Sequence, residues 1–253
     1  MNATPARFGL ALLLGVLLVA PTASAQVSAP ASSPDTVISA RLKYLSLQGP
    51  VAGVDILLAS GKRLPVAAAT DYISNACAYQ GSARLTFTRS LHPADQPAAP
   101  NAAGKTAAAA TEVLATLDLP GGGDFLLLFS GDATRRLHVL AVPFSPTDVP
   151  SSSCLVWNIT PRNLGLVLGG QRVLLASGHR QLVRPATGPA KNYFDLRIFD
   201  EHEGRLRPLA GGPHLLGEHS RQLLFIVEKV PGQAPVAVRT IEELPEPQMA
   251  MNR

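Results

Sequence analysis

The chain has 253 residues, a formal net charge of +4 and 46% hydrophobic residues, enough for a sizeable core. Its 22 Lys and Arg residues are scattered and form no basic stripe interleaved with aromatic residues, which disfavours nucleic-acid binding. The 21 glycines and 22 prolines punctuate the chain at short intervals, which favours many short strands over long helices.

The N-terminus has the pattern of a secretory signal peptide. Arg7 precedes an apolar or small stretch from Phe8 to Ala20, and Ala23 and Ala25 are the small residues that a signal peptidase needs. As a helix this stretch is about 20 Å long, short of the roughly 30 Å of a bilayer core. We therefore expect cleavage after Ala25 and export to a periplasm or the extracellular space, with an uncleaved membrane anchor as the alternative. Removing Arg7 takes the net charge from +4 to +3.

Three segments lack the pattern of folded structure. Residues 26–36 are rich in Pro, Ser and Ala, and we expect a flexible lead-in. Residues 92–111 are rich in Pro and Ala and predict a long, disordered surface loop. Residues 244–253 predict a disordered tail.

Short segments with period-two alternation predict strands in all the rest of the chain. Between Val37 and Leu47, for example, Ile38, Ala40 and Leu42 alternate with polar residues. We expect strands at 37–47, 54–59, 63–66, 72–76, 83–88, 112–119, 125–129, 137–142, 154–159, 164–168, 171–176, 180–184, 193–199, 205–209, 221–229 and 235–241.

An internal repeat divides this strand pattern into two halves. Leu57–Arg63 reads LLASGKR and Leu174–Arg180 reads LLASGHR, an offset of 117 residues. Each half also ends in a similar apolar hairpin, and a Pro/Ser-rich joint at 145–153 separates the halves. We therefore predict an all-β fold of two tandem antiparallel β-sandwich domains of immunoglobulin-like size, at 37–145 and 150–243. One continuous barrel or sandwich is the alternative.

The stretch from Ala40 to Arg89 resembles the domain-of-unknown-function family 4397 of exported bacterial proteins. The resemblance covers about a fifth of the chain. Its recognisable parts are an opening strand, a Val-Asp-apolar segment, a glycine turn, an aromatic segment and a final strand: ARLKYLSL at 40–47, VDIL at 54–57, DYI at 71–73 and ARLTFT at 83–88. It implies an extracytoplasmic β domain and assigns no functional residue.

The chain has two cysteines, Cys77 and Cys154, one in each half. An even count in an oxidising compartment predicts a candidate disulfide, which would close a loop of 77 residues (154 − 77) and contribute roughly 4–5 kcal/mol. Two separate buried thiols are the alternative.

Motifs for cofactors and catalysis are lacking. Gly104-Lys105-Thr106 resembles the end of a phosphate-binding loop, but Ala99 stands where that motif needs glycine. His202, His214 and His219 with neighbouring glutamates form the densest set of zinc-type ligands, in turn-like sequence that favours solvated loops. Since no serine lies in a GxSxG motif either, we expect no cofactor, no metal and no enzymatic activity.

Three tyrosines are candidate ligand-facing aromatics: Tyr72, Tyr79 and Tyr193 lie next to polar or turn residues. Carbohydrate-binding sandwiches usually present exposed aromatic rings for stacking on sugars. The small number of aromatic residues in this chain disfavours such a module, and these three tyrosines keep it as an alternative. Asn158-Ile159-Thr160 resembles a glycosylation acceptor, but Pro161 disfavours modification.

The sequence favours an exported, non-catalytic β-sandwich protein that acts as a binding or structural module of the cell envelope. We expect its partner to be a protein or another envelope component, with contacts concentrated at loops and sheet edges. A carbohydrate-binding module is the first alternative. A hydrolase with an unrecognised site is the second, because catalytic triads are defined by geometry and not by sequence order.

Overall fold

The computed structural model describes residues 36–90, 111–132, 136–187, 192–202, 205–228 and 235–243. Within these ranges every regular element is a β-strand. The predicted signal peptide and tail lie outside the described residues. So do the predicted lead-in and surface loop, apart from their last residues, Thr36 and Thr111.

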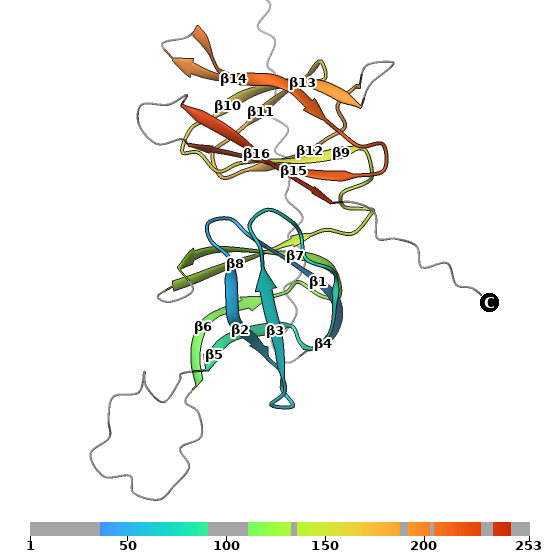
Figure 1. Cartoon of the computed structure of the whole chain (residues 1–253), viewed down its shortest axis with the longest axis vertical. Helices are drawn as coiled ribbons and strands as arrows, with labels where there is room; N and C mark the ends of the chain where they lie inside the picture. Colours follow the sequence, from blue (N-terminus) through green and yellow to red (C-terminus); the bar gives the residue numbers. More distant parts are fainter. Residues whose placement is uncertain are drawn as a thin grey trace, which may run out of the picture. The chain divides into compact units, whose positions relative to one another are not determined.

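The first eight strands form two four-stranded sheets that pack face to face (Figure 1). Sheet A has the strand order β4-β1-β7-β8 and sheet B the order β3-β2-β5-β6. Their bounds are β1 (Val37–Ser46), β2 (Val51–Leu57), β3 (Arg63–Ala68), β4 (Cys77–Ser82), β5 (Arg84–Ser90), β6 (Thr111–Asp118), β7 (Gly123–Asp132) and β8 (Arg136–Pro143).

The next eight strands form a second sandwich, of sheet C (β12-β9-β15-β16) and sheet D (β11-β10-β13-β14). Figure 1 shows these sheets as two separate layers. Their bounds are β9 (Ser153–Asn158), β10 (Leu164–Leu168), β11 (Gln171–Leu175), β12 (Arg180–Val183), β13 (Tyr193–His202), β14 (Arg205–Leu215), β15 (Arg221–Glu228) and β16 (Val236–Glu243).

The two sandwiches have one topology. Adding eight to each strand number converts sheet A into sheet C and sheet B into sheet D. The pairing of described strands is antiparallel except between β1 and β7 and between the equivalent β9 and β15, which are parallel. The predicted fold class, an all-β chain of two tandem sandwiches, is therefore confirmed, and the parallel pairs are a feature that the patterning did not reveal.

The repeated heptapeptide does not mark equivalent positions. Leu57–Arg63 closes the hairpin between β2 and β3 within sheet B, whereas Leu174–Arg180 connects β11 of sheet D to β12 of sheet C. The two segments share turn chemistry, since Gly61 (φ +76°) and Gly178 (φ +73°) both take the left-handed conformation that glycine adopts readily. The similarity of the two halves is thus real, but this heptapeptide is not the reason for it.

Each sandwich has its own apolar core, made by the inward-facing residues of both its sheets. In the first, Phe87 of sheet B meets Phe129 of sheet A edge to face, with ring centroids 5.6 Å apart. Fully burying one such side chain contributes about 1.5–3 kcal/mol. Cores of this size explain why each half folds around paired sheets.

A third cluster draws on both sandwiches, within the unit Ala31–Arg253. Its apolar residues come from β1, β7, β8 and the segment after β8, and from β9, β15 and β16: Leu45, Leu126, Leu128, Val142, Phe144, Val149, Leu155, Leu223, Phe225 and Ile241. Beside them Glu243 accepts from Lys43 Nζ at 2.5 Å and pairs with Arg221. Arg221 also donates to the carbonyl of Phe144 at 3.2 Å and lies over its ring.

One predicted strand is wrong. Residues 72–76 form no strand, because Ser74 hydrogen-bonds the backbone of Tyr44 through both its own backbone and its hydroxyl, and Ile73 packs against the third cluster. The strand begins directly after this segment, as β4 (Cys77–Ser82), in which only Tyr79 is buried. A strand with a single buried side chain shows little alternation, which is why the sequence did not reveal it.

Candidate functional site

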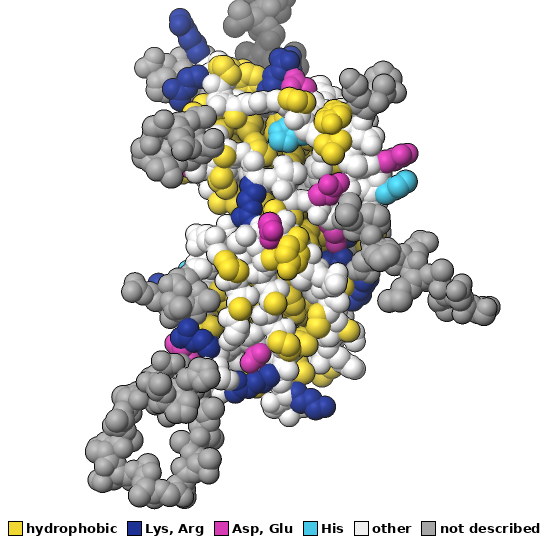
Figure 2. Space-filling view, viewed as in Figure 1, with side chains coloured by type: hydrophobic (Ala, Val, Ile, Leu, Met, Phe, Trp, Pro, Cys, Tyr) yellow, Lys and Arg dark blue, Asp and Glu magenta, His cyan; other side chains and the backbone are white. Residues whose placement is uncertain are grey.

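A hollow of about 810 Å³ lies on the outer face of sheet D, the face turned away from sheet C. We call it the sheet D hollow. Its walls are mostly apolar, and the residues that matter below are Gly165, Val167, Arg172, Leu174, Arg197, Phe199 and Leu206. In Figure 2, yellow apolar and dark blue basic side chains lie side by side over β13 and β14.

Strand alternation explains which residues reach this face. β10 buries its three leucines at 164, 166 and 168, so Gly165 and Val167 face outward. β11 buries Val173 and Leu175 and turns Arg172 and Leu174 outward. In the same way β13 buries Leu196 and Ile198 and presents Arg197 and Phe199.

The strand register aligns these residues in two rows. One row runs Leu174, Gly165, Phe199 across β11, β10 and β13. Neighbouring strands lie about 4.8 Å apart, so the two flanking side chains rise about 10 Å from each other with glycine between them. Gly165 has no side chain to fill the space between them, so its backbone forms the floor of the sheet D hollow.

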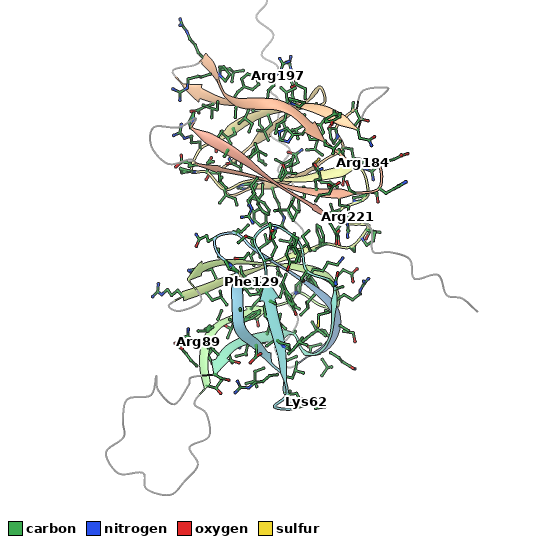
Figure 3. The ribbon with its side chains drawn as sticks, viewed as in Figure 1. Lys62, Arg89, Phe129, Arg184, Arg197 and Arg221 are labelled. Atoms are coloured by element: carbon green, nitrogen blue, oxygen red, sulfur yellow. The ribbon has the colours of Figure 1, made fainter. Side chains whose placement is uncertain are left out.

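The second row, two residues along the strands, runs Arg172, Val167, Arg197. Figure 3 shows Arg197 on the outer side of sheet D. Its Nε donates to Asp195 Oδ2 at 2.7 Å, in an exposed pair. Arg172 is exposed and has no hydrogen bond or ion pair to another residue in the described part of the chain. A cationic row therefore borders an apolar one.

The walls of the hollow are open to solvent. Leu174 is 88% exposed and Leu206 is 70% exposed. Two further hollows adjoin the first: one of about 320 Å³ shares Gly165, Leu174 and Leu206 with it, and one of about 460 Å³ shares Arg197 and Phe199. Together they make an apolar band across sheet D, the kind of surface that marks an interaction site.

The equivalent face of the first sandwich can be aligned with this one through a β-bulge. The register between β5 and β6 shifts after Phe87, where Leu114 of β6 is the extra residue. The register between β13 and β14 shifts after Ile198, where Leu209 of β14 is the extra residue. A cross-strand ion pair follows in both copies with its charges exchanged: Arg89 with Glu112 at 2.7 Å, and Asp200 with Arg207 at 3.3 Å. These landmarks make Phe199 the equivalent of Thr88.

The same alignment places Asp55 of β2 at the position of Gly165, since Asp55 pairs with Thr88 and Gly165 with Phe199. Counting along the ladder, Arg63 of β3 corresponds to Arg172 of β11. In sheet B, Asp55 Oδ2 lies 3.7 Å from Arg63 Nη1, and Arg63 also donates to Thr111 Oγ1 at 2.7 Å. Sheet B thus has the Asp55 carboxylate at the position where sheet D has Gly165, the floor of the hollow.

The three tyrosines expected to face a ligand do not form one surface. Tyr79 is 4% exposed, its hydroxyl donates to the carbonyl of Ser82 at 2.7 Å, and burial raises its pKa. It is a core residue of the first sandwich, so the prediction that it faces a ligand is wrong. Tyr72, between β3 and β4, and Tyr193, at the start of β13, are exposed but belong to different sandwiches.

The structure does not contain the candidate disulfide. Cys77 and Cys154 are both free, and each belongs to the core of its own sandwich. Cys77 contacts Tyr44, whose pKa is raised by burial and, to a smaller extent, by this thiol. Burial raises the pKa of Cys154 to about 12. Both thiols behave as small apolar residues of separate cores.

The histidines and acids do not assemble into a ligand set where their side chains are described. In those ranges no three His, Cys, Asp or Glu side chains are grouped as a metal site would require. His214 instead stacks on Phe194 with ring centroids 5.7 Å apart, and desolvation lowers its pKa against the opposing effect of Asp195. The side chain of His202 lies outside the described part of the chain.

Sequence reasoning missed the sheet D hollow. One signal for it was present: a glycine inside a strand pattern, as in LGLVL at 164–168, marks a bulge or a close approach of another molecule. The flanking side chains could not be assigned, because their contact depends on pairing between distant strands.

Comparison of the sequence with known proteins found no match that bears on this surface. No protein-family model matches the chain, and no curated protein matches it. Within the described ranges no helix has the length and apolar character of a membrane span.

Proposed function

We propose that this chain is an exported, non-catalytic binding protein, and that it docks a protein partner of the cell envelope on the outer face of sheet D. The observation that carries the proposal is the exposure of Leu174 (88%) and Leu206 (70%) around a hollow floored by Gly165. Burying apolar area releases about 25 cal/mol per Å², so covering these leucines stabilises a complex.

The chemistry of the hollow favours binding over catalysis. The charged side chains among its described lining residues are Arg172 and Arg197. A guanidinium stays protonated and serves neither as a nucleophile nor as a general base, the two roles that hydrolysis most needs. A non-catalytic role is therefore the one that we propose for this site.

The openness of the hollow favours a protein as its occupant. Leu174 and Leu206 project outward, so a small ligand lying on the floor would leave them in water, whereas a protein surface covers both. The tyrosines expected to stack on a sugar do not line the hollow, since Tyr79 is buried and Tyr72 and Tyr193 lie in different sandwiches. The surface is thus better matched to a protein than to a carbohydrate.

Export is part of the proposal and rests on the leader at residues 1–25, whose basic, apolar and small-residue order is that of a secretory signal. Mass spectrometry of protein purified from the cell envelope or the medium should find Gln26 as the first residue. A protein that keeps its leader and stays in the cytoplasm contradicts this part.

Site-specific photocrosslinking tests the docking surface. We expect p-benzoylphenylalanine at Leu174 to give a discrete crosslinked product with an envelope protein in the producing cells. The same group at Leu57, an exposed residue on the outer face of sheet B, is the matched control. Absence of a Leu174 product, or equal products from both positions, contradicts the proposed function.

A further inference from the structure

We propose that Arg172 anchors a carboxylate of the partner protein, and that this carboxylate takes the place that the Asp55 side chain has in the first sandwich. The inference rests on the proposed function and adds the chemical class of the docked segment. It predicts an extended segment with an Asp or Glu side chain beside apolar ones.

The internal comparison is the first support. In sheet B, Asp55 and Arg63 stand diagonally across neighbouring strands and form an ion pair at 3.7 Å. In sheet D, Gly165 and Arg172 have the same diagonal relation, about 7–8 Å between backbones. The cation is present in both copies and the acid in one, so sheet D offers a cation to an outside acid.

The state of Arg172 is the second support. It is exposed and bonds no other residue that the structure describes, whereas Arg197 across the row is paired with Asp195. A guanidinium binds a carboxylate with two parallel hydrogen bonds, which specifies orientation as well as charge. Among the described residues that line the hollow, Arg172 is therefore the cation that remains available to a ligand.

The surroundings of the empty position define the rest of the ligand. A Cβ built on Gly165 would lie 3.8 Å from Phe199 Cβ and 4.0 Å from Leu174 Cδ2, which is ordinary van der Waals contact. An acidic side chain above Gly165 can thus reach Arg172 and pack between Leu174 and Phe199. In an extended segment, residues two apart face one side about 6.6 Å apart, matching the spacing of the two rows.

Labelled peptides test the inference directly. The probes are fluorescein-labelled Leu-Ser-Glu-Ser-Leu, in which Glu and both leucines face one side when the peptide is extended, the same peptide with Gln or Lys in place of Glu, and decanoate as a competing lipid acid. Each is titrated into the chain from Gln26 onward, with fluorescence anisotropy as the readout. The protein variants are Gly165→Asp, which supplies an internal acid to Arg172, Arg172→Gln, and Asp55→Gly as the control in sheet B. Urea unfolding checks that each variant is folded.

We expect the Glu peptide to bind about tenfold or more tightly than the Gln peptide, and the Lys peptide most weakly. Gly165→Asp and Arg172→Gln should each remove the difference between the Glu and Gln peptides, and Asp55→Gly should preserve it. Equal binding of the Glu and Gln peptides, a preference that survives Gly165→Asp, or no peptide binding at millimolar concentration overturns the inference. So does decanoate binding that depends on Arg172 when the peptides do not bind. The crosslink at Leu174 tests the proposed function separately. A partner that crosslinks at Leu174 equally well in the Arg172→Gln variant would contradict the carboxylate inference and leave the docking surface standing.

Discussion

Gly165 and Asp55 occupy the same position in two copies of one fold, and only Asp55 has a side chain to offer the arginine diagonal to it. In the first sandwich Asp55 therefore pairs with Arg63, whereas in the second the position above Gly165 is a hollow bordered by Arg172. The consequences for folding and for binding can be measured separately.

The fold does not need glycine at position 165. Its φ is not in the left-handed region, and a Cβ there makes ordinary contacts at 3.8 and 4.0 Å. Because glycine weakens a strand relative to alanine, Gly165→Ala should raise the free energy of unfolding by about 0.5–1 kcal/mol. Urea denaturation measures this change.

Gly211 on β14 is the matched control for Gly165. There a Cβ would lie 2.8 Å from the carbonyl oxygen of Leu196, so Gly211→Ala should cost about 1–3 kcal/mol. If both alanine variants lose stability alike, glycine at 165 is a requirement of the fold, and the functional reading of the hollow loses support.

Asn158 links the loop after β9 to the end of β11 from a fully buried position. Its Nδ2 donates to the carbonyls of Arg162 at 2.6 Å and Leu175 at 3.1 Å, and its Oδ1 accepts from Thr160. Asn158→Ala removes these bonds from buried polar groups and should lower the free energy of unfolding by about 2–4 kcal/mol. Burial also makes this amide inaccessible to glycosylation.

Asn163 is the control for Asn158, because its single bond, from Ser177 N at 3.1 Å, is exposed. Asn163→Ala should cost about 1 kcal/mol or less. Thermal or urea unfolding of both variants checks the difference, and equal losses contradict the role that we give Asn158.

The ion network of Glu243 should matter more than the surface pairs. Lys43 and Glu243 are 13% and 9% exposed and lie 2.5 Å apart. Glu243→Gln removes the carboxylate that pairs with Lys43 and Arg221 and should lower the free energy of unfolding by about 3–5 kcal/mol. Asp118→Asn, which breaks the exposed pair with Arg84, should have little effect. Equal effects would show that the network is solvated.

Stability should fall on mild acidification because of His214. Desolvation lowers its pKa below the ordinary 6.5, so the unfolded chain binds the proton first as the pH falls. Stability is therefore lost as the pH falls through 6.5 toward the folded-state pKa. His214→Gln should flatten this part of a stability–pH curve, with His138→Gln, on an exposed position of β8, as the matched control. A slope changed equally by both variants contradicts the assignment.

The thiols give a test that is independent of any ligand. Since burial raises the pKa of Cys154 to about 12, iodoacetamide at about pH 8 should leave it unmodified in the folded protein and alkylate it in urea. Peptide mapping of the protein purified without reducing agent should find Cys77 and Cys154 unbonded. A peptide pair joined through these residues would refute the arrangement of separate cores.

Local alternation predicted much of the fold. LGLVL at 164–168 became β10 with the predicted bounds, because three buried leucines alternate with the partly exposed Gly165 and Val167. β4 failed this test, since CAYQGS buries Tyr79 alone and the preceding Tyr72-Ile73-Ser74 looks more strand-like. Alternation reports burial on one face, and a strand at a sheet edge buries little.

The site could not be predicted, because it depends on which distant residues become neighbours. Leu174 and Leu175 are adjacent leucines in one apolar run, and only pairing with β10 decides that Leu175 is buried and Leu174 is 88% exposed. Likewise Tyr79 was expected to be exposed beside turn residues, but β4 turns it into the core. Gly165 within a strand pattern was a local signal of the hollow. The side chains on either side of it, Leu174 and Phe199, come from β11 and β13 and could not be assigned from the sequence.

The claim that the second sandwich and not the first holds the docking surface is tested most directly by hydrogen–deuterium exchange of the chain, alone and bound to the partner captured at Leu174. We predict that binding slows exchange in β10, β11 and β13, around Gly165, Leu174 and Phe199, and leaves β2, β3 and β5 unchanged. Slower exchange confined to the strands of sheet B, or unchanged exchange throughout sheet D, would contradict the account.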